Sequence, residues 1–83
     1  MTQPKILIVD DEPFNVDYLE QELEDMNYSI ITACNGREAL DQVRSEQPDL
    51  ILLDIMMPIL DGFAVLAELK SNPLLRHIPV IVI

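Results

Sequence analysis

The sequence predicts an α/β fold built on an open parallel sheet. Two runs of apolar residues without polar alternation, Ile6–Val9 and Leu50–Leu53, have the pattern of strands that are buried on both faces. An aspartate follows each run directly, at Asp10 and at Asp54. Segments with apolar residues at helical spacing separate the strand-like runs, and this alternation is typical of right-handed β-α-β crossovers.

The first half of the chain is expected to form two strands and two helices. Ile6–Val9 is the first strand, and a first helix runs roughly from Pro13 to Met26, because proline suits the first helical turn. The second strand, Ser29–Ala33, mixes polar with apolar residues, which favours an edge position. Asn35-Gly36 forms a turn before a second helix that ends near residues 45–47. The expected apolar face of the first helix consists of Phe14, Tyr18, Leu19, Leu23 and Met26.

The second half adds two strands and one helix. Asp49–Leu53 is the central strand of the expected sheet. Asp61 is a suitable N-cap for a third helix, which Asn72-Pro73 breaks. Pro79 precedes a fourth strand, Val80–Ile83, which is apolar throughout. The expected apolar set of the third helix consists of Phe63, Val65, Leu66 and Leu69.

Length and charge restrict the class of protein. With 83 residues the chain is long enough for one small domain. The 15 acidic and 5 basic residues give a formal net charge of -10, which argues against nucleic-acid binding and against adhesion to anionic membranes. Cys34 is the sole cysteine, which excludes an internal disulfide and favours a reducing compartment. The chain shows no signal-peptide pattern and no apolar run of membrane-spanning length, so we expect a cytoplasmic protein.

Three carboxylates are the candidate functional residues. Because the carboxyl ends of neighbouring parallel strands meet at one edge of a sheet, we expect Asp10, Asp11 and Asp54 to lie together. Their like charges repel unless a cation offsets them, and Mg²⁺ prefers such oxygen ligands. A carboxylate beside such a metal can attack phosphorus and form an aspartyl phosphate. The alternative is that Asp10 and Asp11 only start the first helix and that Asp54 only ends a strand.

These residues also carry a family resemblance. The stretches Val9–Pro13 (VDDEP) and Asp54–Gly62 (DIMMPILDG) closely resemble the receiver domain of bacterial two-component response regulators. The resemblance covers the whole chain. It implies that Asp54 accepts a phosphoryl group from a partner sensor histidine kinase, and that an output domain of unknown type belongs to the parent protein.

The resemblance further implies a metal site and a strand order. Asp11 and Asp54 would bind Mg²⁺, helped by the backbone carbonyl of Met56, with Asp10 acting largely through metal-bound water. The fold would be flavodoxin-like (receiver-type), with strand order 2-1-3-4. Compared with the family's pattern, residues 1–83 lack the fifth strand, the last two helices, the switch hydroxyl and the lysine that pairs with the phosphoryl group. We therefore expect a single truncated receiver domain whose phosphorylation is impaired.

Two alternatives stand beside the leading hypothesis of a signalling module that is not an enzyme. One is an assembly or oligomerisation fragment whose acidic site is a relic. The other is a small Mg²⁺-dependent phosphohydrolase with Asp54 as its nucleophile, although no general acid is visible. An uncharged β-branched strand at a sheet edge is a template for pairing with another chain. We therefore also expect a homo-oligomer, such as a homodimer, that forms through the exposed fourth strand, Val80–Ile83.

Overall fold

The computed structural model describes residues 3–54 and 62–83. In these residues four parallel strands alternate with three helices, and the sheet order β2-β1-β3-β4 confirms the predicted fold class. The elements are β1 (Lys5–Val9), α1 (Pro13–Glu24), β2 (Ser29–Ala33), α2 (Gly36–Glu46), β3 (Leu50–Leu53), α3 (Gly62–Ser71) and β4 (Val80–Val82).

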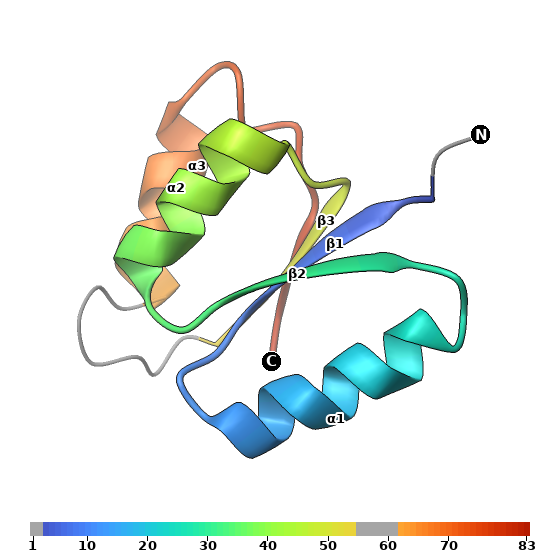
Figure 1. Ribbon diagram of the computed structural model, residues 1–83. Coiled ribbons are helices and arrows are strands. Elements are labelled where there is room, and N and C mark those ends of the chain that lie inside the picture. The colour runs from blue at the N-terminus through green and yellow to red at the C-terminus, as the bar shows by residue number, and fades with distance from the viewer. Residues whose placement is uncertain (1–2, 55–61) are drawn as a thin grey trace.

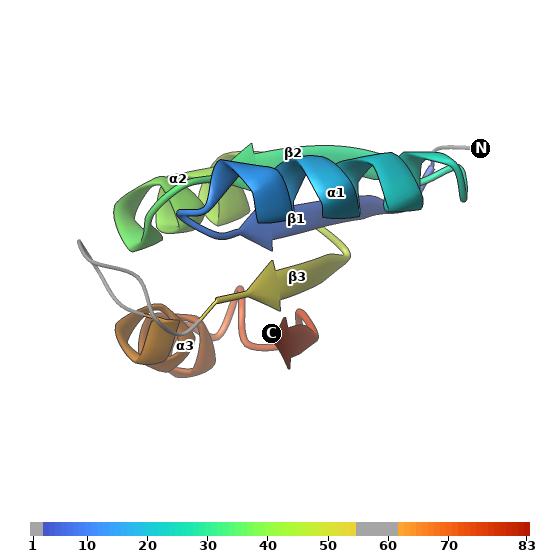
Figure 2. The same cartoon turned by 90° about the horizontal axis from the view of Figure 1, so that it is seen from below.

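The two faces of the sheet are covered unequally. Helices α2 and α3 lie together on one face, and α1 lies alone on the other (Figures 1 and 2). The main core fills the space beneath α2 and α3, whereas the contacts of α1 with the sheet fall mainly on β1 and β2. The core residues on the strands are Leu7, Val9, Ala33, Ile51 and Leu53, and those on the helices and the α3–β4 connection are Ala39, Leu40, Val43, Val65, Leu69, Leu75 and Ile78.

Burial of the strands follows this unequal cover. Strand β1 lies between β2 and β3, and its residues from Ile6 to Val9 are buried on both faces, as the sequence predicts. Strand β3 corrects the prediction, because Leu50 and Leu52 are only half-buried while Ile51 and Leu53 are buried. Side chains alternate between the faces of a strand. Leu50 and Leu52 therefore point to the face where α1 covers mainly β1 and β2.

Helix α1 is shorter and less embedded than predicted. It ends at Glu24 instead of Met26, and Asn27 reverses the chain with a left-handed φ of 67°. Phe14, Tyr18 and Met26, which were expected on the apolar face, are 82%, 65% and 63% exposed. A single helix on a sheet needs only a narrow apolar stripe, which here consists of the half-buried residues Val16, Leu19 and Leu23.

The remaining element boundaries agree with the sequence to within a residue or two. Asn35 caps α2, because its side chain accepts a hydrogen bond from the backbone N–H of Glu38 at 2.9 Å. Strand β4 ends at Val82, one residue before the predicted end. The predicted N-cap of α3, Asp61, lies outside the described residues. No helix in residues 3–54 and 62–83 is long and apolar enough to cross a membrane.

Candidate functional site

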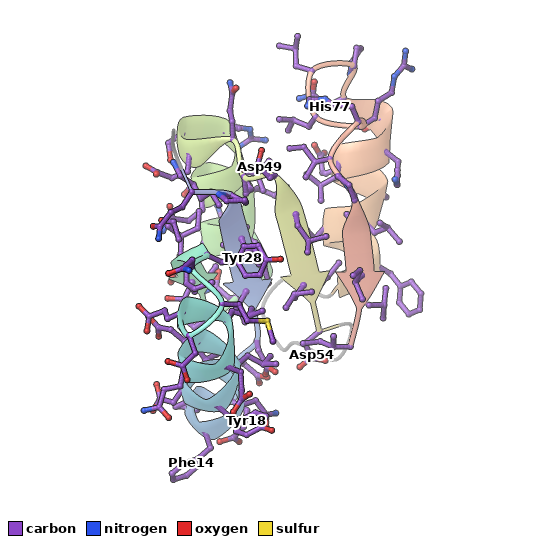
Figure 3. The ribbon with its side chains drawn as sticks, turned by 90° about the vertical axis from the view of Figure 1, so that its right-hand side faces the viewer. Phe14, Tyr18, Tyr28, Asp49, Asp54 and His77 are labelled. Carbon is purple, nitrogen blue, oxygen red and sulfur yellow. The ribbon has the colours of Figure 1, made fainter. Side chains whose placement is uncertain are left out.

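The positions of Asp10 and Asp54 follow from the pairing of β1 with β3. The two strands are parallel and in register, so the residues that follow them leave the sheet side by side. Backbone hydrogen bonds continue past the strand ends, since the Asp54 N–H donates to the Val9 carbonyl at 2.9 Å and the Asp10 N–H donates to the Ala33 carbonyl at 3.1 Å. Figure 3 shows Asp54 beyond the tip of β3, at the end of the sheet where α1 begins.

The structure brings the three sequence-predicted aspartates together. One carboxylate oxygen from each of Asp10, Asp11 and Asp54 lies within 4.8 Å of the others. Among the described residues this is the one group of three or more acidic, histidine or cysteine side chains with such spacing. Asp10 is buried at 4% exposure, Asp54 is half-buried and Asp11 is exposed. The acidic cluster is therefore anchored in the sheet on one side and open on the other.

The buried carboxylate of Asp10 is held by two donors from the start of α1. Its Oδ1 accepts a hydrogen bond from the Glu12 backbone N–H at 2.9 Å, and its Oδ2 accepts one from Asn15 Nδ2 at 3.4 Å. Glu12 is the N-cap residue of α1, but its own side chain makes no capping hydrogen bond. Asp10 thus connects the end of β1 to the first turn of α1.

The electrostatics of the cluster favour a bound cation. Burial raises the pKa of the Asp10 carboxyl above its usual 3.8, and the neighbouring charge of Asp54 raises it further, while the Glu12 N–H and the Asn15 amide oppose the rise. Two hollows adjoin the cluster, and no lysine or arginine of the described residues lines either of them. Three carboxylate oxygens this close together fit a hard divalent ion such as Mg²⁺.

The hollow beside Asp54 gives the cluster access to solvent. It has a volume of about 330 Å³ and lies between the start of α1 and the ends of the strands. Its wall is part polar and part apolar, formed by Asp10, Asn15, Tyr18, Leu19, Asp54 and Ile83. A second hollow of about 210 Å³ reaches from Asp10 and Asp11 toward the start of α2. A small phosphorylated molecule or a partner's side chain has room to approach Asp54 from the first hollow.

One expected site residue cannot be placed, and one site residue was missed. Met56, expected to contribute its backbone carbonyl, lies outside the described residues. Asn15 was not singled out from the sequence, although its side chain contacts Asp10. The available signal was its position in the first turn of a helix that starts directly after two aspartates. At that position a polar side chain can reach back to the end of the preceding strand.

The sheet order and the acidic cluster together define a class of protein: an α/β domain with a carboxylate site at the carboxyl edge of a parallel sheet. The chain matches the response regulator receiver domain over residues 6–83. It therefore belongs to the receiver domain family. Receiver domains are signalling modules rather than enzymes and pair with histidine kinases, so the phosphohydrolase alternative is set aside.

Individual relatives agree with this assignment. The chain is 48% identical over 79 residues to the response regulator PleD of Caulobacter vibrioides, a match that covers 95% of this chain and 17% of PleD. It is 42% identical to the polar-differentiation response regulator DivK of Brucella anthropi, covering 94% of this chain and 63% of DivK.

A solved structure shows the same fold. The N-terminal domain of a response regulator receiver protein from Methanoculleus marisnigri JR1 superposes with a TM-score of 0.91 at 45% identity, covering 94% of this chain and 63% of that one. The chain thus spans less than two thirds of the length of each of these three proteins.

Proposed function

We propose that residues 1–83 act as one phosphoacceptor unit of a two-component system. In this proposal Asp54 receives a phosphoryl group from a sensor histidine kinase while Mg²⁺ is bound beside it. The observation that supports the proposal is the meeting of Asp10, Asp11 and Asp54 within 4.8 Å at the carboxyl edge of the sheet. Family membership supports the class of partner, since receiver domains pair with histidine kinases.

Each aspartate has its own part in the proposed transfer. Asp54 is the nucleophile, because it is half-buried and lines the hollow of about 330 Å³ through which a donor can approach. One of its oxygens forms a bond to phosphorus as the bond from phosphorus to the donor breaks, and the electron pair of that bond leaves with the donor. Asp10 and Asp11 hold the cation together with Asp54, and the Met56 carbonyl is proposed as a further ligand. When bound, Mg²⁺ offsets the negative charge on the phosphoryl oxygens.

We expect the transfer to be slow in the 83-residue polypeptide. No basic side chain of the described residues lines the hollows beside the cluster, so within residues 3–54 and 62–83 none is aimed at the charge that develops on the phosphoryl group. Loss of one such donor typically lowers a rate by roughly 10²–10³. Acetyl-phosphate labelling should therefore accumulate over hours and not reach stoichiometry within minutes.

The proposal is tested by acetyl-phosphate labelling followed by intact-protein mass spectrometry, with and without Mg²⁺. Wild type should gain one phosphoryl group in a Mg²⁺-dependent manner, and Asp54→Asn should gain none. Asp41→Asn is the matched control, because Asp41 is an exposed aspartate on α2. It should label like wild type. Equal labelling of Asp54→Asn, or no labelling of wild type after a day, would contradict the proposal.

A second proposal concerns assembly. Among the described residues β4 is an edge strand, and Ile81, Val82 and Ile83 at its end are 51%, 52% and 49% exposed. Exposed apolar residues beside unpaired backbone groups favour association with another chain. We propose that two copies of the 83-residue polypeptide meet through this strand, independently of phosphorylation.

A further inference from the structure

The orientation of the Asp10 carboxylate is controlled from the start of α1. Both of its oxygens accept a hydrogen bond, Oδ1 from the Glu12 backbone N–H at 2.9 Å and Oδ2 from the Asn15 amide at 3.4 Å. The Glu12 donor belongs to the backbone and is present whatever the side chain is. The Asn15 donor is a side-chain amide, so this hydrogen bond depends on the identity of residue 15.

The placement of Asn15 is set by the first turn of α1. Its backbone N–H donates to the Glu12 carbonyl at 3.1 Å, so the turn fixes the Cα of Asn15 relative to the donor that serves the other oxygen of Asp10. An ionised carboxylate only accepts hydrogen bonds, so the amide group must present its NH₂ and not its carbonyl oxygen to Asp10. An amide nitrogen does not bind a hard cation. Asn15 can therefore act on the metal only through Asp10.

Two donors on two oxygens fix the plane of a carboxylate more firmly than one does. With the Glu12 N–H alone, rotation of the Asp10 carboxylate about its Cβ–Cγ bond is restrained only at Oδ1, which leaves it some rotational freedom. The Asn15 amide removes this freedom and leaves each oxygen a further lone pair for a metal ion or a metal-bound water. Outer hydrogen bonds of this kind orient metal ligands, and their removal lowers metal affinity.

We infer that Asn15 is a positioning residue for the cation site: from the first turn of α1 it holds the Asp10 carboxylate in the orientation that a divalent cation requires. This inference rests on the metal site of the proposed function. It adds a residue that does not touch the cation and that makes the start of α1 a functional part of the site.

The test is the affinity for Mg²⁺, measured from the amide chemical shifts of residues 10–12, 14, 15 and 54 during a titration, with no phosphodonor present. In Asn15→Leu the side chain keeps the branched shape of asparagine and favours the helix, but it has no hydrogen-bond donor. This variant should bind Mg²⁺ about 3- to 10-fold more weakly than wild type, which is less than the roughly 10- to 100-fold typical of residues that orient metal ligands, because the hydrogen bond is long at 3.4 Å. Asn15→Gln keeps an amide on a longer side chain and should restore part of the affinity.

Gln21→Leu is the control on the same helix, because it also replaces an exposed amide by leucine without a change of charge. It should bind Mg²⁺ like wild type, and urea unfolding without Mg²⁺ should show that all variants are folded. If wild type binds Mg²⁺ and Asn15→Leu binds equally well, the positioning role is wrong while the proposed function stands. If folded wild type shows no shifts at millimolar Mg²⁺, the metal site itself fails and the inference fails with it.

Discussion

Asp10 is the residue at which the stability of this domain and its proposed function oppose each other. It is 4% exposed, and its carboxyl is close to that of Asp54. Burial first, and the charge of Asp54 second, raise its pKa above 3.8. An ionised Asp10 therefore destabilises the Mg²⁺-free protein at neutral pH, and a bound cation would offset this cost.

Replacement of this carboxylate should stabilise the Mg²⁺-free protein. Asp10→Asn keeps an oxygen that accepts the Glu12 N–H but removes the buried charge, so we expect a gain on the order of 1 kcal/mol in the free energy of unfolding. For a domain of this size the melting temperature should rise by roughly 4–8 °C. Thermal unfolding in EDTA, monitored by circular dichroism, measures this change in melting temperature. The exposed-site variant Asp41→Asn should change little, and a destabilised Asp10→Asn would contradict the expectation.

The same carboxyl predicts a pH dependence with a defined sign. Its pKa is raised in the folded state, so the folded protein takes up the proton at a higher pH than the unfolded chain, whose value is near 3.8. The loss of stability caused by the ionised Asp10 carboxylate is therefore complete above the pKa of Asp10 in the folded protein. It shrinks as the pH falls through that pKa and is absent below about 3.8. Urea unfolding of wild type and Asp10→Asn from pH 7 toward pH 4 should show the two stabilities converging. A difference that grows on acidification would refute this assignment.

At the scale of single elements, α1 and α2 begin in different ways. Helix α2 has a side-chain N-cap, in which Asn35 Oδ1 accepts from the Glu38 N–H at 2.9 Å. The Glu38 carboxylate reaches back and accepts from the Cys34 N–H at 3.3 Å, which satisfies a second backbone donor. The N-cap of α1, Glu12, makes no side-chain hydrogen bond of this kind. The start of α1 depends on Asp10 and on Pro13 in its first turn.

This contrast predicts unequal effects of truncating the two caps. Asn35→Ala should cost about 1 kcal/mol of stability, because it leaves the Glu38 N–H without its acceptor. Glu12→Ala should change stability by less than about 0.5 kcal/mol, because the side chain caps nothing. Urea unfolding of the two variants and of wild type measures both changes in the free energy of unfolding. Equal losses would show that the cap assignment is wrong.

At the scale of the whole molecule, the unequal cover of the sheet is the dominant feature. Helices α2 and α3 enclose one face, while on the other face α1 leaves β3 and β4 less covered (Figure 2). The half-buried Leu50 and Leu52 and the exposed Ile81 lie on this less covered face. The formal charge of -10 opposes association between copies, and salt screens that repulsion.

The assembly proposal therefore predicts a salt-dependent self-association. Sedimentation of the 83-residue polypeptide at micromolar concentration should show dimers or larger species, more of them at high salt. Val82→Lys places a charge on the exposed edge strand and should shift the population to monomer. Ala67→Lys is the control, because it places the same charge at an exposed position on α3. It should leave the monomer population unchanged. A folded monomer at all salt concentrations, unchanged by Val82→Lys, would rule the assembly out.

Local patterns in the sequence predicted most of the fold and the members of the acidic cluster. Unbroken apolar runs marked β1 and β3, helical spacing marked the three helices, and the position of Asp10 and Asp54 directly after two strands predicted that they meet. These features are local, or follow from a general rule about parallel sheets, so one chain is enough to read them. The roles of Asp54 and Met56 stay predictions until the labelling and Mg²⁺ experiments are made.

The tertiary structure decided which apolar residues are covered and which polar side chain supports the site. Phe14 and Tyr18 fit a helical apolar face, yet they are exposed because α1 lies over β1 and β2 with only a narrow stripe in contact. Leu52 has the pattern of a fully buried strand residue, yet it is half-buried because α1 does not enclose that part of the face. The hydrogen bond from Asn15 to Asp10 depends on the angle at which α1 leaves β1. The spacing of apolar residues predicts whether a stretch forms a helix or a strand. Which residues of two elements touch depends on how the elements pack in space, and no single stretch of the chain determines that packing.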